Sequence, residues 1–218
     1  AIALSLKSLD AIMSKESSCD NLILLYERNF DENKANIVWL KRATARMYAK
    51  NCSNSELFVQ LVEAMYGIEP SADSAYYLGS LNDKKGKDEQ AVAYWEESLD
   101  LETDPYKKAK ILYKIALKFK EKGRKTTARN YARKALSFQP SLGKAYLMIA
   151  NLYANSANNC GKSQFEKRAV YWLAANTARK AASVDASIKK SALKSVAAFN
   201  GRAPSKTDIF TDGMEGKV

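Results

Sequence analysis

A repeat of small and aromatic residues at a fixed spacing constrains the fold of this chain more than any other feature. Ala116 and Phe119 recur as Ala150 and Tyr153, each 34 positions later. An earlier step, from Gly79 to Ala116, covers 37 positions because three extra residues intervene. Self-similarity at such a period indicates an array of stacked units, each of which is one supersecondary element.

The small residues of each unit are interpreted as the points where helices touch, because two helices approach closely only where side chains are small. They are Gly79, Ala116 and Ala150 on the first helix of each unit, and Ala91, Ala128 and Ala135 on the second. Gly86 and Gly123 fall between the two helices, where a positive φ is easiest for glycine. The pattern therefore predicts pairs of helices joined by tight turns.

This pattern resembles the tetratricopeptide repeat (TPR) family over roughly residues 71–186, preceded by a degenerate unit that ends at Pro70. The resemblance implies an all-α, right-handed α-solenoid of antiparallel helix pairs. We predict N-terminal helices in a degenerate repeat, a TPR array with an insertion at 155–168, and a C-terminal capping helix and tail. Their boundaries are 1–50, 51–186 and 187–218.

Three further stretches look like envelope-associated TPR proteins of Bacteroidota-type bacteria. They are NSELFVQLVEAMYGIEPSADSAYYLG, NSANNCGKSQFEKRAVYW and APSKTDIF. That resemblance implies export, with a signal peptide missing from the sequence, and a periplasmic or cell-envelope location. A cytoplasmic location is the alternative, and no apolar run approaches the roughly 20 residues of a membrane span.

The composition disfavours an enzyme or a metalloprotein. The sequence contains no histidine, which removes the commonest general base and the commonest metal ligand. Its three cysteines, Cys19, Cys52 and Cys160, form no CxxC pair. We expect no cofactor and no metal site. In a cytosolic protein the cysteines are expected to be buried, inert thiols. Cys160 lies in the insertion, and a disulfide from Cys160 to Cys52 is the hypothesis for an oxidising compartment.

Charge is unevenly distributed along the array. Residues 105–144 hold thirteen Lys and Arg against one acid, whereas residues 71–104 hold nine Asp and Glu against three Lys. Lys110, Lys114, Lys118 and Lys122 recur every four residues and form one stripe on a helix.

The resemblance carries several residues onto positions that TPR proteins use for ligand contact. They are Lys110, Lys114, Lys144, Tyr76, Tyr77, Tyr113 and Asn151. The set looks like part of a clamp for a peptide's C-terminal carboxylate, but Met148 stands where a basic or amide residue is expected. The alternative interpretation is a solvated lysine face.

We expect a non-enzymatic protein-interaction scaffold that binds an acidic or extended protein segment in its concave groove. The alternative is nucleic-acid binding through the basic repeat 105–144, where tyrosines alternate with cations. Two features disfavour it: Phe119 has a packing role in the repeat, and the neighbouring acidic unit would repel phosphates. The sequence leaves the partner and the oligomeric state open.

Overall fold

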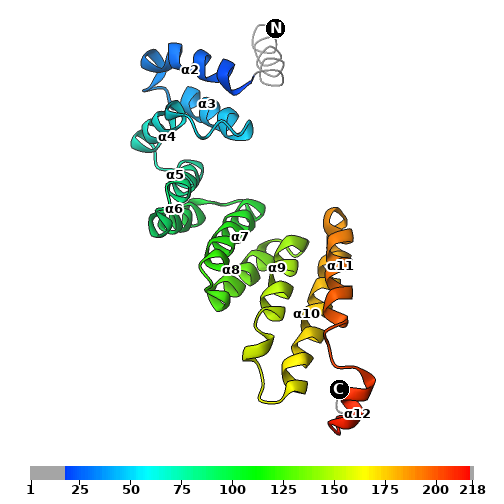
Figure 1. Ribbon diagram of the computed structural model, residues 1–218. Coiled ribbons are helices and arrows are strands. Elements are labelled where there is room, and N and C mark those ends of the chain that lie inside the picture. The colour runs from blue at the N-terminus through cyan, green and yellow to red at the C-terminus, as the bar shows by residue number, and fades with distance from the viewer. Residues whose placement is uncertain (1–17, 217–218) are drawn as a thin grey trace. The chain divides into compact units, whose positions relative to one another are not determined.

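The computed structural model describes residues 18–216, and every regular element among them is a helix (Figure 1). The chain divides into two compact units: unit 1 ends at Glu102 and unit 2 begins at Thr103. The fold class predicted from the sequence, all-α with paired helices, is confirmed. The helical spacing expected in residues 1–13 lies outside the described residues, and the repeat boundaries at 50/51 and 186/187 remain a prediction.

Unit 1 contains five described helices, which are α2 (Cys19–Asn33), α3 (Ile37–Ala49), α4 (Glu56–Ile68), α5 (Ala72–Lys84) and α6 (Asp88–Leu101). The helices of unit 2 are α7 (Pro105–Glu121), α8 (Lys125–Phe138), α9 (Gly143–Ala154), α10 (Gln164–Val184), α11 (Lys189–Asn200) and α12 (Lys206–Thr211). Two short 3₁₀ turns, η1 (Ala157–Asn159) and η2 (Ala186–Ile188), flank α10. Between residues 18 and 216 no helix combines the length and the apolar character needed to cross a membrane.

Glycine turns join the helices of the clearest pairs. Gly86 links α5 to α6 with a φ of +71°, and Gly123 links α7 to α8 with a φ of +72°. A Cβ at either position would meet no atom within 4 Å, so the backbone conformation rather than space favours glycine. The Arg124 N–H closes its turn by donating to the Phe119 carbonyl at 2.9 Å. The positive φ predicted at both glycines is confirmed.

Small residues lie where the helices pack. A Cβ on Gly79 of α5 would come within 2.4 Å of Cδ1 of Trp95 on α6, so only glycine fits there without a shift of the ring. In unit 2, Ala116, Ala128 and Ala145 of α7, α8 and α9 are fully buried in one cluster. The interpretation of the small residues as contact points is therefore confirmed.

The core of unit 1 is built from larger apolar side chains. Leu40 and Met47 of α3 pack with Phe58 and Leu61 of α4 in one cluster, and all four are fully buried. These residues follow the helical spacing of an amphipathic face, which is why α3 and α4 pair although they carry no clear repeat signature.

A disulfide joins α2 to the segment after α3. Cys19 and Cys52 lie with their sulfur atoms 2.17 Å apart and their Cα atoms 5.3 Å apart, and Cys160 is a free thiol. The hypothesis of a Cys52–Cys160 disulfide is therefore wrong. Cys52 is placed in the core of unit 1 beside α2, whereas Cys160 belongs to the insertion in unit 2.

Proline and aspartate set the start of α7. The carboxylate of Asp104 accepts from the backbone N–H groups of Tyr106 and Lys107 at 2.7 and 3.2 Å, and Pro105 occupies the first helical position. Proline suits that position because its missing N–H would have no partner inside the helix. The basic helix α7 therefore begins at a fixed residue.

The insertion lengthens α10 instead of forming only a loop. α10 has 21 residues, against 14 each in α6 and α8. Its start is fixed by a capping box between Ser163 and Glu166. Figure 1 shows α12 beside the N-terminal end of α10.

Alanine dominates the buried face of α10. α11 packs along this face through Val196 and Phe199. The buried alanines are Ala174, Ala175, Ala178, Ala181 and Ala182. This alanine face lets α10 lie close to both α9 and α11.

Candidate functional site

The residues predicted to contact a ligand are divided between the two units. Tyr76 and Tyr77 lie on α5 of unit 1. Five others lie in unit 2: on α7 these are Lys110, Tyr113 and Lys114, and on α9 they are Lys144 and Asn151. The structure therefore brings five of the seven residues into one unit, on first helices of successive pairs.

Tyr113 takes part in the packing of unit 2. Its half-buried ring packs against the cluster that contains Ala145 and Met148 of α9. Burial raises the pKa of the Tyr113 phenol. The ring therefore has a packing role inside unit 2 in addition to any ligand contact.

The three lysines of unit 2 that were predicted to contact a ligand differ in their surroundings. Lys110 and Lys144 are exposed, while Lys114 is half-buried. Lys110 and Lys114 already take part in interactions within the chain. Lys144 lies near Asp185, whose carboxylate has a pKa below its usual value; the side-chain hydrogen bond from Ser187 is the main cause, and the charge of Lys144 adds to it. An acidic ligand would therefore have to compete with the interactions that these lysines already make within the chain.

Asn151 makes a local contact. Its side-chain amide donates to the carbonyl of Leu147, one turn earlier on α9, at 2.9 Å. The side-chain oxygen of the half-buried Asn151 is left available as an acceptor for a peptide N–H.

Tyr76 and Tyr77 belong to an aromatic cluster inside unit 1. The ring of Tyr77 lies 4.8 Å from that of Tyr48 on α3 and 5.9 Å from that of Phe58 on α4, measured between centroids. The hydroxyls of Tyr48 and Tyr76 are 3.5 Å apart. We name these four rings, Tyr48, Phe58, Tyr76 and Tyr77, the aromatic cluster. It joins three helices, so the two predicted contact residues have a packing role that the sequence alone did not indicate.

Because of the aromatic cluster, we expect unit 1 to lose stability at high pH. Desolvation by burial raises the pKa of Tyr77 to about 12 and also raises that of Tyr76. Because both pKa values in the folded chain exceed the value of about 10 in the unfolded chain, their contribution to stability is complete below pH 10. The contribution of Tyr77 is lost as the pH rises from about 10 to about 12, and that of Tyr76 is lost at higher pH. Phenolate absorbance, followed together with circular dichroism, should show a late fraction of tyrosines that ionises as unit 1 unfolds. Ionisation of every tyrosine near pH 10 with the helices intact would contradict this assignment.

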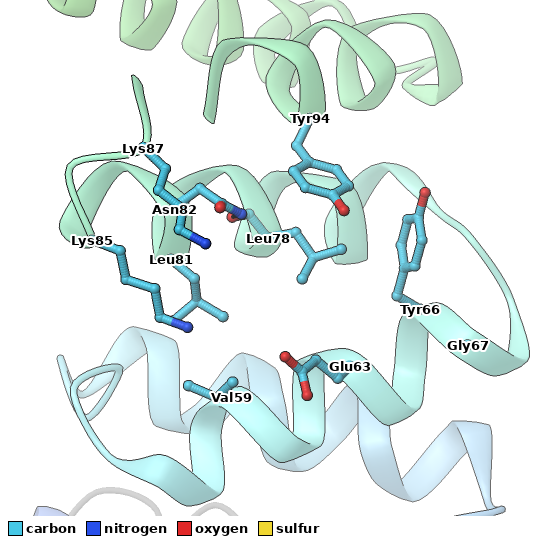
Figure 2. A pocket seen from close by; sticks show the side chains of 10 residues that line it. All are labelled: Val59, Glu63, Tyr66, Gly67, Leu78, Leu81, Asn82, Lys85, Lys87 and Tyr94. Atoms are coloured by element: carbon cyan, nitrogen blue, oxygen red, sulfur yellow. Dashed lines mark hydrogen bonds between the residues drawn. The ribbon is translucent and has the colours of Figure 1, made fainter. Parts of the chain in front are cut away.

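A groove of about 300 Å³ lies between α4, α5 and α6 of unit 1 (Figure 2). Leu78 and Leu81 of α5 are buried beneath it. Figure 2 shows Tyr94 reaching towards them from α6, and Val59 and Glu63 from α4. The groove therefore combines an apolar base with polar side chains at its edges.

The edges of this groove carry one fixed tyrosine and two cations. Tyr66 donates from its hydroxyl to a carboxylate oxygen of Glu97 at 2.8 Å, and this hydrogen bond is the main cause that raises the pKa of Tyr66. Its ring lies edge-to-face with that of Tyr94, with centroids 5.9 Å apart. Lys85 and Lys87 form no ion pair with another described residue. The sequence did not predict this groove, because α4 lies in the degenerate repeat that ends at Pro70.

Comparison with known proteins gives one sequence relative and several structural neighbours. No protein-family model matches the chain. The photosystem I assembly protein Ycf3 of Cyanophora paradoxa is 30% identical over 107 residues, which cover 45% of this chain and 62% of that protein. The match thus spans less than two thirds of this relative.

Two crystal structures of MamA share the fold. One aligns over 76% of this chain and 91% of its own, with a TM-score of 0.58 and 20% identity. The other aligns over 80% and 86%, with a TM-score of 0.60 and 19% identity. Together with the helix pairs and glycine turns described above, they define a helical-repeat protein. The chain has the TPR fold, as its sequence pattern predicts.

Proposed function

We propose that this chain is a non-enzymatic scaffold that binds other proteins. The observation that carries the proposal is the positive charge of residues 105–144, which hold thirteen cations and one acid and include all of α7 and the start of α9. We name the exposed sides of these two helices the α7–α9 surface. Stacked helix pairs hold such a surface in a fixed shape, so a partner segment binds without first ordering the receptor. The similarity to Ycf3, which is named as an assembly protein, supports a scaffold role for this chain.

The partner segment that best fits this surface is acidic or extended. Lys110, Lys114 and Lys144 supply positive charge from two neighbouring first helices, and Asn151 supplies an acceptor for the segment's backbone. Charge of this kind mainly selects the partner and speeds its association. The half-buried Tyr113 adds flat apolar contact area beside the lysines.

Nucleic acid is the weaker candidate for the same basic segment. Its aromatic rings are engaged in packing: Phe119 stacks on Tyr131 with centroids 5.4 Å apart, and the Arg124 guanidinium lies over Phe119 at 4.7 Å. Rings held in this way are less available as platforms for bases. Tyr106, which is 65% exposed, is the one aromatic of α7 that favours this alternative.

The test is a pull-down from native lysate with the wild-type chain and the variant Lys110→Glu/Lys114→Glu, at several salt concentrations and with nuclease. We expect the variant to recover about tenfold less of a protein partner, because reversal of two charges turns attraction into repulsion. Recovery by the wild type should fall with salt and should not change with nuclease.

The matched control is Lys189→Glu/Lys190→Glu, which makes the same charge change on exposed positions of α11. It should retain the partner. Because Lys110 and Lys114 take part in interactions within the chain, thermal unfolding by circular dichroism must show that both variants fold. Equal recovery by all three proteins would contradict the α7–α9 surface. Recovery that disappears with nuclease would favour nucleic acid.

A further inference from the structure

The insertion of unit 2 builds a groove that a regular helix pair would not contain. α10 exceeds α6 and α8 by about two turns. Those turns carry Gln164, Lys167, Arg168 and Tyr171, which line one side of the groove. Asn158 of the insertion and the link between α11 and α12 complete it, and its volume is about 380 Å³.

Arg168 fixes the walls of this groove relative to one another. Its guanidinium donates to the backbone carbonyls of Arg202 and Ala203 at 3.1 and 2.9 Å, and it pairs with the carboxylate of Asp208 at 2.9 Å. These contacts hold the α11–α12 link and the start of α12 against α10. They also neutralise Arg168, so its charge is not available to a ligand.

Two other cations of the groove remain uncompensated. Neither Lys167 nor Arg202 forms an ion pair with a described residue. The Arg202 guanidinium lies over the ring of Tyr171, 5.8 Å from its centroid. The nearest acid in sequence, Glu166, accepts from the backbone N–H groups of Lys162 and Ser163 instead. The groove therefore has two positive charges that are not neutralised.

The remaining lining adds neutral polar and aromatic groups. The side chains of Asn158 and Gln164 form no hydrogen bond with a described residue, so each offers a donor and an acceptor. Tyr171 offers an aromatic face, although Arg202 covers part of it. The cations and amides suit an oxyanion, and the ring suits an apolar group attached to that oxyanion.

The number of charges selects the class of ligand. Recognition of an anionic membrane generally uses clusters of about 4–8 basic residues, and binding along a nucleic-acid backbone often involves about 6–10 phosphate contacts. Two uncompensated cations are too few for either surface. They suit one or two carboxylates on a protein segment, which also has backbone groups for Asn158 and Gln164.

We propose that this groove, which we name the insertion groove, binds an acidic protein segment. The carboxylates of the segment pair with Lys167 and Arg202, and an apolar side chain next to them lies on Tyr171. The insertion groove is a second site on unit 2, formed by elements other than α7 and α9, and it does not depend on the function of the α7–α9 surface.

The test uses a capped ten-residue peptide with two Glu beside one Leu, and a second peptide with Gln in place of both Glu. Each is titrated into the ¹⁵N-labelled full chain and followed by NMR. We expect the Glu peptide to shift the amide signals of Lys167, Tyr171 and Arg202. The variant Lys167→Gln/Arg202→Gln should bind it about tenfold more weakly, because each lost charged hydrogen bond is replaced by a neutral one.

Two control variants separate this site from general charge effects. Lys189→Gln/Lys190→Gln removes the same charge from α11 and should leave binding unchanged. Lys110→Gln/Lys114→Gln should also leave the shifts around Tyr171 unchanged, so failure of the insertion groove and failure of the α7–α9 surface are distinguishable.

Three results would overturn the proposal. The first is equal binding of the Glu peptide by the wild type and by Lys167→Gln/Arg202→Gln. The second is equal binding of the Gln peptide, which would show that the carboxylates are not recognised. The third is that vesicles with 30% anionic lipid, but not the peptide, bind through Lys167 and Arg202, which would make the groove a membrane contact.

Discussion

Replacement of Trp95 by alanine is expected to lower the free energy of unfolding of unit 1 by about 3–5 kcal/mol. Trp95 is fully buried, and its ring lies directly against the α-carbon of Gly79 on the facing helix. Gly79 has no side chain that could relax into the space, so this wall of the cavity should persist. Urea denaturation followed by circular dichroism measures the loss.

A substitution on the other side of the same contact tests the argument independently. Gly79→Ala should cost about 1–3 kcal/mol, because the new Cβ would overlap the Trp95 ring and overpack the helix pair. Trp172→Ala, at a half-buried tryptophan of unit 2, is the matched control and should cost less than Trp95→Ala. A loss below about 1 kcal/mol for Trp95→Ala would show that this contact does not hold α5 to α6.

Reduction of the Cys19–Cys52 disulfide is expected to lower the free energy of unfolding of unit 1 by about 3–4 kcal/mol. The two cysteines are separated by 33 positions, and closing a loop of that length in the unfolded chain removes about this much conformational entropy. The measurement is urea denaturation with and without reductant. Cys19→Ser should show the same loss and should no longer respond to reductant.

Two observations can contradict the disulfide prediction. Cys160→Ser is the control, because Cys160 is a free thiol and its loss should leave the response to reductant intact. Mass mapping without reduction should recover the peptides of Cys19 and Cys52 linked together. A Cys52–Cys160 linkage, or an unfolding midpoint that does not change with reductant, would refute the assignment.

The sequence predicted those parts of the fold in which geometry restricts the residue type. A positive φ favours glycine, which identifies Gly86 and Gly123, and a close helix approach requires a small residue, which identifies Gly79 and Ala116. These positions repeat along the chain, so one unit supports the interpretation of the next.

The sequence did not predict contacts that depend on the position of the degenerate N-terminal helices. The role of Tyr77 in the aromatic cluster depends on where α3 and α4 place Tyr48 and Phe58. The pairing of Cys19 with Cys52 also depends on proximity in space rather than on spacing. Helical register tells which face a residue occupies, but not which neighbour covers that face.

The sequence contains a signal for the extension of α10. The insertion at 155–168 is polar and contains Gly161, features that are typical of a loop. Ser163 followed by Glu166 is nevertheless a capping-box pattern, and the structure shows both of its hydrogen bonds. This pattern predicts that α10 begins at Gln164, earlier than the repeat register alone would indicate. The additional first turns form one side of the insertion groove.

The alanine face of α10 reduces the side-chain entropy that is lost when the C-terminal end of the array folds. It also restricts which residues can replace these alanines. Alanine has no side-chain rotamers to lose on burial, whereas each leucine or methionine loses about 0.5–2 kcal/mol of rotamer freedom. Ala178 and Ala181 therefore pack with almost no entropic penalty, unlike Leu40 and Met47 in unit 1. Any larger residue on this face would have to separate whole helices rather than choose another rotamer. Variation in this region of the chain should therefore accumulate on the exposed side of α10, while its buried side stays limited to the smallest residues.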